Sequence, residues 1–137
     1  MTILPNSPTA AGGRTAKTIL IVDDEMANAE VLATILEDEG YRVFCAANGL
    51  HGLERVAEVR PDLVILDFMM PLMDGGEMGK ALRATPATHS IKIVMNSSLS
   101  EHVVREHFPE YDAFLRKPYN VDKALLLIRS LLADCSD

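Results

Sequence analysis

The residues best suited to chemistry are polar side chains that each follow a short apolar run. Such a run is typical of a buried parallel strand, and in open α/β sheets ligands bind outside the carboxyl ends of the strands. The clearest case is Asp67, which ends the run 63–66 and precedes the chain-breaking Pro71 and Gly75. Taken alone, Asp67 is as consistent with a helix cap as with a site residue. The other polar residues at the ends of apolar runs are Asp23, Asp24, Ser97 and Lys117.

Parallel strands end at one edge of a sheet, so these side chains are expected to converge. Carboxylates this close raise one another's pKa values unless a cation neutralises them, and partly hydrated oxygen ligands suit Mg2+. A hydroxyl and an ammonium group beside them would hold the charged oxygens of a phosphoryl group that a carboxylate attacks. The pattern predicts a phosphoryl-accepting site in which Asp67 attacks, Ser97 forms a hydrogen bond and Lys117 supplies a fixed positive charge.

Five apolar runs are expected to form the strands that position this site, and helical patterns separate them. Helices are expected to begin after Asn48, Ser100 and Asn120, which are suitable N-caps. Strands that alternate with helices require right-handed crossovers and a parallel sheet. The expected fold class is therefore α/β, a doubly wound (βα)5 sandwich with a central five-stranded parallel sheet. The predicted strands are 18–22, 41–45, 63–67, 91–95 and 111–115.

Composition limits the kind of protein. The chain has 137 residues, 48% of them hydrophobic, which suits one domain that buries a core without disulfides. A net charge of -7 and scattered basic residues argue against nucleic-acid binding. Cys45 and Cys135 fit a reducing compartment, and no apolar run approaches the ~20 residues of a membrane span. We expect a cytoplasmic domain at 17–133, with tails at 1–16 and 134–137, that binds neither nucleic acid nor a membrane.

With these residues in this order, the sequence resembles the receiver domain of bacterial two-component response regulators, of the single-domain type. The resemblance covers residues 17 to about 132 and implies a flavodoxin-like strand order, 2-1-3-4-5. The matching positions are the acidic pair Asp23-Asp24, the phosphoacceptor Asp67, the loop 71–75 after it, the Ser/Thr position at Ser97, and the lysine and proline at Lys117-Pro118.

The resemblance also implies roles for single residues. Asp24 and Asp67, together with the backbone carbonyl of Met69, would ligate Mg2+, and Asp23 would act through water. Ser97 and Phe114 would form the conformational switch, which is biased by the charge of the phosphate. The peptide bond between Lys117 and Pro118 is expected to be cis.

The implied partners are proteins. A histidine kinase or phosphotransfer protein would donate the phosphoryl group to Asp67, and an unknown downstream protein would respond. The chain would be a monomer or a weak phosphorylation-dependent dimer, with a stand-alone signalling or phosphorelay role and no DNA-binding output. It would not be an enzyme. It would be a phosphoacceptor that promotes its own phosphorylation and also its own dephosphorylation, the latter at a slow rate. By analogy with the family, Met69 and Leu99 flank the path of the attacking water, and their apolar side chains predict that slow rate.

Two other functions fit parts of the pattern. One is a Mg2+-dependent phosphatase of the haloacid-dehalogenase kind, which needs a second aspartate two residues after its nucleophile, where this chain has Met69. The other is a pseudo-receiver that is not phosphorylated and serves only as a docking module. The complete set of site residues disfavours the pseudo-receiver.

Three features depart from the expected pattern. Asn96 and Ser98 stand where the resembling family more often has apolar residues. The segment 98–114 is slightly short and lacks the usual Gly-Ala before the last strand, which puts the fourth helix in question. Gly79 lies inside the third predicted helix, where glycine costs ~1 kcal/mol relative to alanine. A close contact between this helix and the sheet would explain Gly79.

Overall fold

The protein forms one sheet of five parallel strands, whose order is β2-β1-β3-β4-β5. We describe residues 16–133 in a computed structural model. The predicted tails, 1–16 and 134–137, and Cys135 fall outside these residues, apart from Ala16, which is buried. The strands are β1 Thr18–Val22, β2 Arg42–Ala46, β3 Leu63–Asp67, β4 Lys92–Ser97 and β5 Ala113–Arg116.

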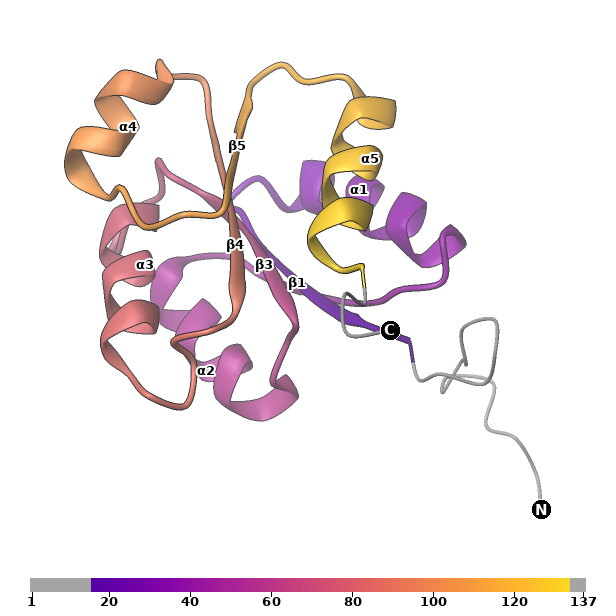
Figure 1. Ribbon diagram of the computed structural model, residues 1–137, viewed down its shortest axis with the longest axis horizontal. Coiled ribbons are helices and arrows are strands. Elements are labelled where there is room, and N and C mark those ends of the chain that lie inside the picture. The colour runs from indigo at the N-terminus through magenta and orange to yellow at the C-terminus, as the bar shows by residue number, and fades with distance from the viewer. Residues whose placement is uncertain (1–15, 134–137) are drawn as a thin grey trace.

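Helices cover both faces of the sheet (Figure 1). One layer holds α1 and α5, and the other holds α2, α3 and α4. The expected doubly wound α/β sandwich with strand order 2-1-3-4-5 is therefore confirmed. The helices are α1 Met26–Asp38, α2 Gly49–Val59, α3 Gly75–Ala84, α4 Glu101–His107 and α5 Val121–Leu131.

Alternation along each strand divides the core between the two faces. In β1, Ile19 and Ile21 pack with buried residues of α1 and α5. The intervening Leu20 and Val22 pack with buried residues of α2 and α3. All four side chains are almost wholly buried, as expected of a central strand covered on both faces.

Polar side chains begin the helices at the residues that the sequence indicates. Asn48, Ser100 and Asn120 each accept a hydrogen bond from a backbone N–H in the first turn of the following helix, as predicted. Asp74 and Glu77 form a reciprocal capping box at the start of α3. This cap ends the loop that follows Asp67, so it helps to fix the backbone beside the predicted phosphoacceptor.

The expected reason for Gly79 is wrong in one respect. The close contact is with Phe108, the fully buried residue that follows α4, and not with the sheet. A β-carbon on Gly79 would lie 2.6 Å from Cε2 of the Phe108 ring. Glycine at this position therefore lets α3 pack directly against the end of α4, the helix whose formation the sequence left in question.

Some boundaries and faces also differ from the prediction. Val121, predicted on the buried face of the last helix, is 38% exposed, and Ala124 is buried instead. The fifth strand begins at Ala113 and not at Tyr111. The Asp112 carboxylate accepts a hydrogen bond from the backbone N–H of Ile93, so this side chain attaches the residue before β5 to strand β4.

Arg83 organises the short segment around α4. Its guanidinium donates to the backbone carbonyls of Glu110, His89 and Ile91, and it forms an ion pair with Asp112 at 2.9 Å. The arginine side chain is 11% exposed. One side chain at the end of α3 thus holds the starts of β4 and β5 together.

We expect Arg83→Met to destabilise the domain by about 2 kcal/mol, because four acceptors would lose their donor in a partly buried setting. Arg129→Met is the matched control, since Arg129 forms an exposed ion pair with Glu39 and its loss should cost less than ~0.5 kcal/mol. Urea unfolding of both variants measures the difference. Equal losses of stability would show that Arg83 does not hold the segment in place.

Candidate functional site

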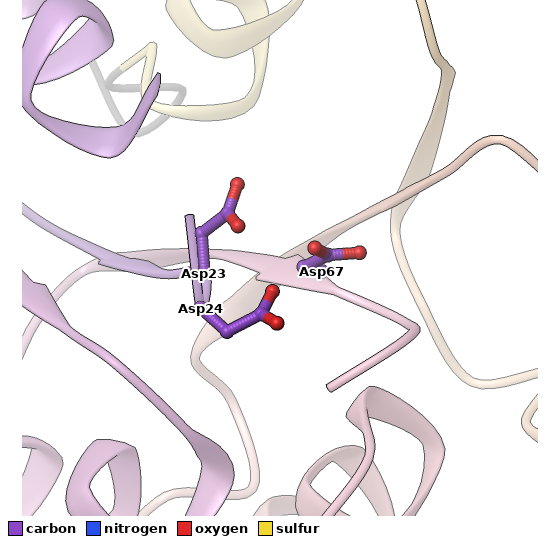
Figure 2. A group of neighbouring side chains, drawn as sticks. All are labelled: Asp23, Asp24 and Asp67. Atoms are coloured by element: carbon purple, nitrogen blue, oxygen red, sulfur yellow. The ribbon is translucent and has the colours of Figure 1, made fainter. Parts of the chain in front are cut away.

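Asp23, Asp24 and Asp67 form the acidic group that the sequence predicts. One carboxylate oxygen of each lies within 4.8 Å of those of the others. Their proximity follows from the sheet, because Val22 of β1 is in register with Leu66 of β3. The next residue along each strand is an aspartate, Asp23 or Asp67. Asp23 and Asp67 are each 5% exposed, whereas Asp24 lies open to solvent. Figure 2 shows the three side chains at the ends of these strands.

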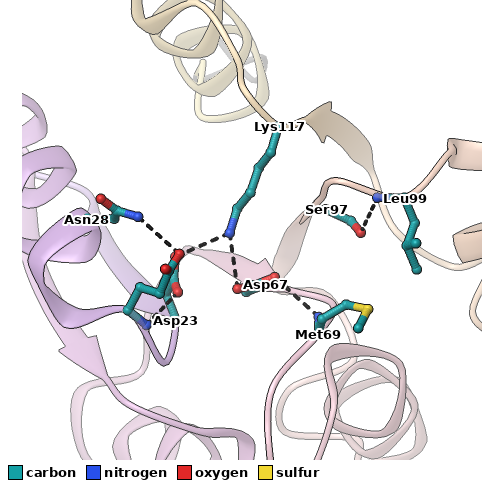
Figure 3. A network of polar contacts seen from close by, with 8 residues as sticks. Asp23, Asn28, Asp67, Met69, Ser97, Leu99 and Lys117 are labelled. Carbon is teal, nitrogen blue, oxygen red and sulfur yellow. Dashed lines mark hydrogen bonds and ion pairs between the residues drawn. The ribbon is translucent and has the colours of Figure 1, made fainter.

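Lys117 lies between the two buried carboxylates (Figure 3). Its Nζ is 3.1 Å from Asp67 Oδ2 and 3.8 Å from Asp23 Oδ2. The backbone N–H of Lys117 donates to the carbonyl of Ser97, which continues the pairing of β5 with β4 past the last strand residue. The bond between Lys117 and Pro118 is cis, as expected.

Burial dominates the electrostatics of Asp67. Loss of hydration raises the pKa of its carboxyl to about 6, although the attraction and hydrogen bond of Lys117 act in the opposite direction. Burial acts to lower the pKa of Lys117, but Asp67 and then Asp23 outweigh it and raise this pKa above its usual value. The Lys117 ammonium therefore offsets only part of the cost of burying the Asp67 carboxylate. Further positive charge nearby would stabilise the ionised form of this carboxylate.

The turns after β1 and β3 hold the buried carboxylates in place. Asp23 Oδ1 accepts a hydrogen bond from the N–H of Glu25 at 2.9 Å, and Asp67 Oδ1 accepts one from the N–H of Met69 at 3.2 Å. The Met69 side chain is 57% exposed beside the site. The predicted use of the Met69 carbonyl as a metal ligand stays a prediction.

The two residues predicted to form the switch, Ser97 and Phe114, have their described contacts with residues other than Asp67. The Ser97 hydroxyl is buried and accepts a hydrogen bond from the N–H of Leu99 at 3.0 Å. Phe114 is half-buried, and its ring centroid lies 6.0 Å from that of Tyr111. Figure 3 shows Ser97 across the site from Lys117, turned toward Leu99.

Sequence reasoning missed a polar cluster next to Phe114. Tyr111 donates through its hydroxyl to Glu101, and Arg105 donates to both of these residues. The cluster ties α4 to the segment that leads into β5. The spacing of Glu101 and Arg105, four residues apart, indicates an ion pair on a helix, but nothing in the sequence marks Tyr111 as its third member.

The donor set at the acidic group fits Mg2+. It consists of three carboxylates with hard oxygen donors, one of them open to solvent, and Mg2+ is bound by a few carboxylates while it keeps several waters. The nitrogen and sulfur ligands that zinc prefers are missing from this cluster. Asp23, Asp24 and Asp67 are the residues that would hold the ion.

The fold and the site define a doubly wound α/β protein with an acidic, lysine-containing site at the carboxyl edge of its sheet. Sequence comparison specifies the family. Residues 19–129 match the response regulator receiver domain. The chain belongs to this family, the receiver domains of two-component systems. This result decides against the haloacid-dehalogenase alternative.

Similar proteins include two curated regulators and one solved structure. The chain is 40% identical to the response regulator MprA of Mycobacterium leprae over 115 residues, which cover 83% of this chain and 50% of that protein. It is 32% identical to the DNA-binding dual master transcriptional regulator RpaA of Synechocystis, over 83% of this chain and 48% of that protein. The response regulator TrrA of Thermotoga maritima, solved in complex with Mg2+ and BeF, is 32% identical with a TM-score of 0.77, over 85% of this chain and 99% of that one.

The chain spans about half the length of the curated relatives it matches. The expected stand-alone role and the expected absence of nucleic-acid binding therefore stay proposals. In the part of the chain that the structure describes, no helix is long and apolar enough to cross a membrane.

Proposed function

We propose that Asp67 accepts a phosphoryl group from a histidine kinase or a phosphotransfer protein and thereby switches the contacts of this domain with other proteins. The observation that supports this most strongly is the buried Asp67 carboxylate, which faces Lys117 at 3.1 Å and belongs to a group of three carboxylates. A carboxylate in this setting has the Lys117 ammonium beside it, and it shares oxygen ligands for a second cation with two neighbouring carboxylates. The Lys117 ammonium and a cation bound by the carboxylates would both attract the oxygens of an incoming phosphoryl group.

In the proposed reaction, a carboxylate oxygen of Asp67 attacks the phosphorus of a phosphohistidine. The new O–P bond forms as the N–P bond breaks, and the electron pair of that bond stays on the imidazole, which takes up a proton. Lys117 would hold a phosphoryl oxygen, and the contact of its Nζ with Asp67 supports this role. Mg2+, bound by Asp23, Asp24 and Asp67, would neutralise the negative charge that builds up on the phosphoryl oxygens.

The proposed switch begins at Ser97. Its hydroxyl would turn from the N–H of Leu99 to a phosphoryl oxygen, and the loop after β4 would follow. Phe114 would then move inward from its half-buried position beside Tyr111. Since Tyr111 binds Glu101 and Arg105, this movement would reach α4 directly.

The remaining parts of the proposal concern partners. We propose a stand-alone signalling or phosphorelay module, monomeric or weakly dimeric when phosphorylated, that acts on a downstream protein. The net charge of -7 and the scattered basic residues support the absence of nucleic-acid binding by these residues. A gel-shift assay with mixed genomic DNA at low salt tests this part, because binding at sub-micromolar protein would contradict it.

Beryllofluoride titration in the presence of Mg2+ tests the proposed function. This complex mimics a phosphoryl group on a carboxylate, so amide NMR signals around Asp67, Ser97 and Phe114 should shift with saturation. No response at Asp67 would overturn the phosphoacceptor function and favour a docking module. Sustained hydrolysis of a phosphate ester would also contradict the proposed function, because a phosphoacceptor does not turn over such a substrate.

The raised pKa of Asp67 predicts that Mg2+ affinity depends on pH. Because Asp67 titrates at about 6, its carboxyl is ionised above that pH and protonated below it. Protons should therefore compete with Mg2+, and the apparent affinity should fall by up to about tenfold per pH unit below pH ~6. Calorimetric titration of wild type and Asp67→Asn measures this, and the variant should lack the step. An unchanged wild-type affinity between about pH 7 and pH 5 would contradict the assignment.

A long lifetime of the phosphorylated state is the next expected outcome. Met69 is 57% exposed beside Asp67, and Leu99 is half-buried next to Ser97, so both offer apolar bulk where a polar side chain would orient water. Met69→Asn with Leu99→Glu should shorten the lifetime by about tenfold or more. Decay of radiolabelled phosphoprotein measures it, with Leu72→Asn as an exposed control nearby. An equal or longer lifetime in the double variant would refute this role.

A further inference from the structure

The loop between β3 and α3, residues 68–74, begins and ends beside Asp67. Where the loop leaves the strand, the N–H of Met69 donates to Asp67 Oδ1 at 3.2 Å (Figure 3). Where the loop returns, the N–H of Gly75 donates to the carbonyl of Phe68 at 2.9 Å. Both ends of the loop are therefore held at the backbone around Asp67.

Leu72 lies near the tip of this loop in an unfavourable backbone conformation. Its φ is 71°, in the left-handed region, where a bulky side chain is an outlier. Across Leu72, the N–H of Met73 donates to the carbonyl of Pro71 at 2.8 Å, which makes Leu72 the central residue of a γ-turn with positive φ, a rare and strained type. Packing within the domain does not explain this strain, because Leu72 is 79% exposed, the highest value among the exposed large hydrophobic residues that the structure describes.

Two more exposed apolar residues lie around the same loop. Met69 is 57% exposed, and Leu50 in the first turn of α2 is 50% exposed. The start of α2 packs on the loop, since a β-carbon on Gly49 would lie 2.7 Å from Cγ of Met73. Single apolar residues on a surface are ordinary, but a strained one at a site is a reason to look for a function.

The burial of Asp67 defines what a protein phosphodonor must cover. Asp67 is 5% exposed, so the donor has to place its phosphohistidine directly over the site. A protein interface of standard size covers about 800 Å² of each partner, which is a roughly circular footprint of about 16 Å radius. The α-carbon of Leu72 lies within about 11 Å of that of Gly75, because three residues separate them. Gly75 in turn packs against the Asp67 carbonyl, so a footprint centred on Asp67 extends to Leu72.

We propose that Leu72 is a docking residue for the protein that phosphorylates Asp67, and that it packs against an apolar side chain beside the donor's phosphohistidine. The inference rests on the proposed function and specifies the partner surface of the same site. The strained turn holds the leucine outward before the donor arrives, and Met69 and Leu50 widen the apolar contact. Leu72 thus favours a protein donor over a small phosphodonor, which has no surface to pack against it.

Comparison of two donors tests this role. Phosphorylated histidine kinases of the source cell are assayed one at a time with the full 137-residue protein, and the kinase with the highest kcat/KM is kept. Phosphoramidate serves as the small donor. We expect Leu72→Asn to lower the ratio of the kinase rate to the phosphoramidate rate by about tenfold or more, because burial of a leucine contributes at least that much to affinity. Leu72→Met keeps an apolar side chain and should keep most of the ratio.

Leu126→Asn is the matched control, since Leu126 is 62% exposed on α5 and should not affect the ratio. The thermal unfolding midpoint of Leu72→Asn should not fall, because asparagine adopts positive φ more readily than leucine. A ratio within about twofold of the wild type in Leu72→Asn would overturn the inference, as would an equal loss in Leu72→Met or Leu126→Asn. A wild type that accepts phosphoryl groups from phosphoramidate but from no kinase would overturn this inference and leave the phosphoacceptor role intact. A wild type that accepts them from neither donor would overturn the proposed function as well.

Discussion

Asp67→Asn is expected to abolish phosphoryl uptake and to leave the fold intact, with stability that is equal to or above that of the wild type when Mg2+ is absent. The physical reason is the raised pKa of Asp67, about 6 against an ordinary value of 3.8. A carboxyl whose pKa is higher in the folded protein than in the unfolded chain binds its proton more tightly when folded, and this stabilises the folded state at low pH. The stabilisation is complete below the pKa of the unfolded chain and is lost as the pH rises through about 6. At neutral pH the ionised Asp67 is therefore an electrostatic cost to the fold, and asparagine removes it.

Thermal unfolding of both proteins without Mg2+ measures the stability difference. The variant should gain on the wild type as the pH rises from about 4 to about 7, and the difference should vanish at the acidic end. Asp62→Asn is the control, because Asp62 accepts a hydrogen bond from the N–H of Thr18 at the opposite edge of the sheet and should not affect phosphoryl uptake. A large loss of stability in Asp67→Asn would mean that Asp67 is a structural cap.

Gly75→Ala is expected to damage both the fold and the site. A β-carbon on Gly75 would lie 2.5 Å from the carbonyl oxygen of Asp67 and 2.8 Å from the α-carbon of Phe68. Both are backbone atoms next to the phosphoacceptor, so the clash cannot be relieved by a side-chain rotation. We expect a loss of about 3 kcal/mol and strongly reduced phosphoryl uptake, since the displaced backbone carries the Asp67 carboxylate.

Gly76→Ala is the matched control for this prediction. Its β-carbon would come no closer than 3.2 Å, to Cε1 of the Phe68 ring, so a small side-chain adjustment suffices. Alanine also gains helix propensity at this position, which offsets part of the cost. Urea unfolding and phosphoryl uptake of both variants give the comparison. Similar stability and uptake in the two variants would show that close approach to the Asp67 backbone is unimportant.

The fold was predictable because its signals are local. Each strand contains a short apolar run. The aspartate that follows β1 and the aspartate that ends β3 meet because parallel strands end at one edge of the sheet. The helix caps at Asn48, Ser100 and Asn120 depend only on neighbouring residues. For the same reason the acidic group could be named from the sequence, although its roles still await the tests above.

The contacts that sequence reasoning missed join residues far apart in the chain. Arg83 forms an ion pair with Asp112, which lies 29 positions later in the chain. The need for glycine at position 79 is explained by the ring of Phe108, the residue that follows α4. No periodic pattern or spacing rule in the sequence indicates either contact. Asn96 was notable in the sequence only as an unusual residue type, and the structure shows that its side-chain oxygen is buried without a hydrogen-bond donor among the described residues.

The central claim is that Asp67 is the phosphoacceptor, and chemical trapping of the phosphorylated residue tests it most directly. The protein is incubated with Mg2+ and phosphoramidate, reduced with borohydride to convert an acyl phosphate into an alcohol, digested, and sequenced by mass spectrometry. We predict homoserine at position 67 in the wild type and no modification in Asp67→Asn. Reduction at another aspartate, a stable phosphate on Ser97, or a wild type that takes up no phosphoryl group would contradict the claim.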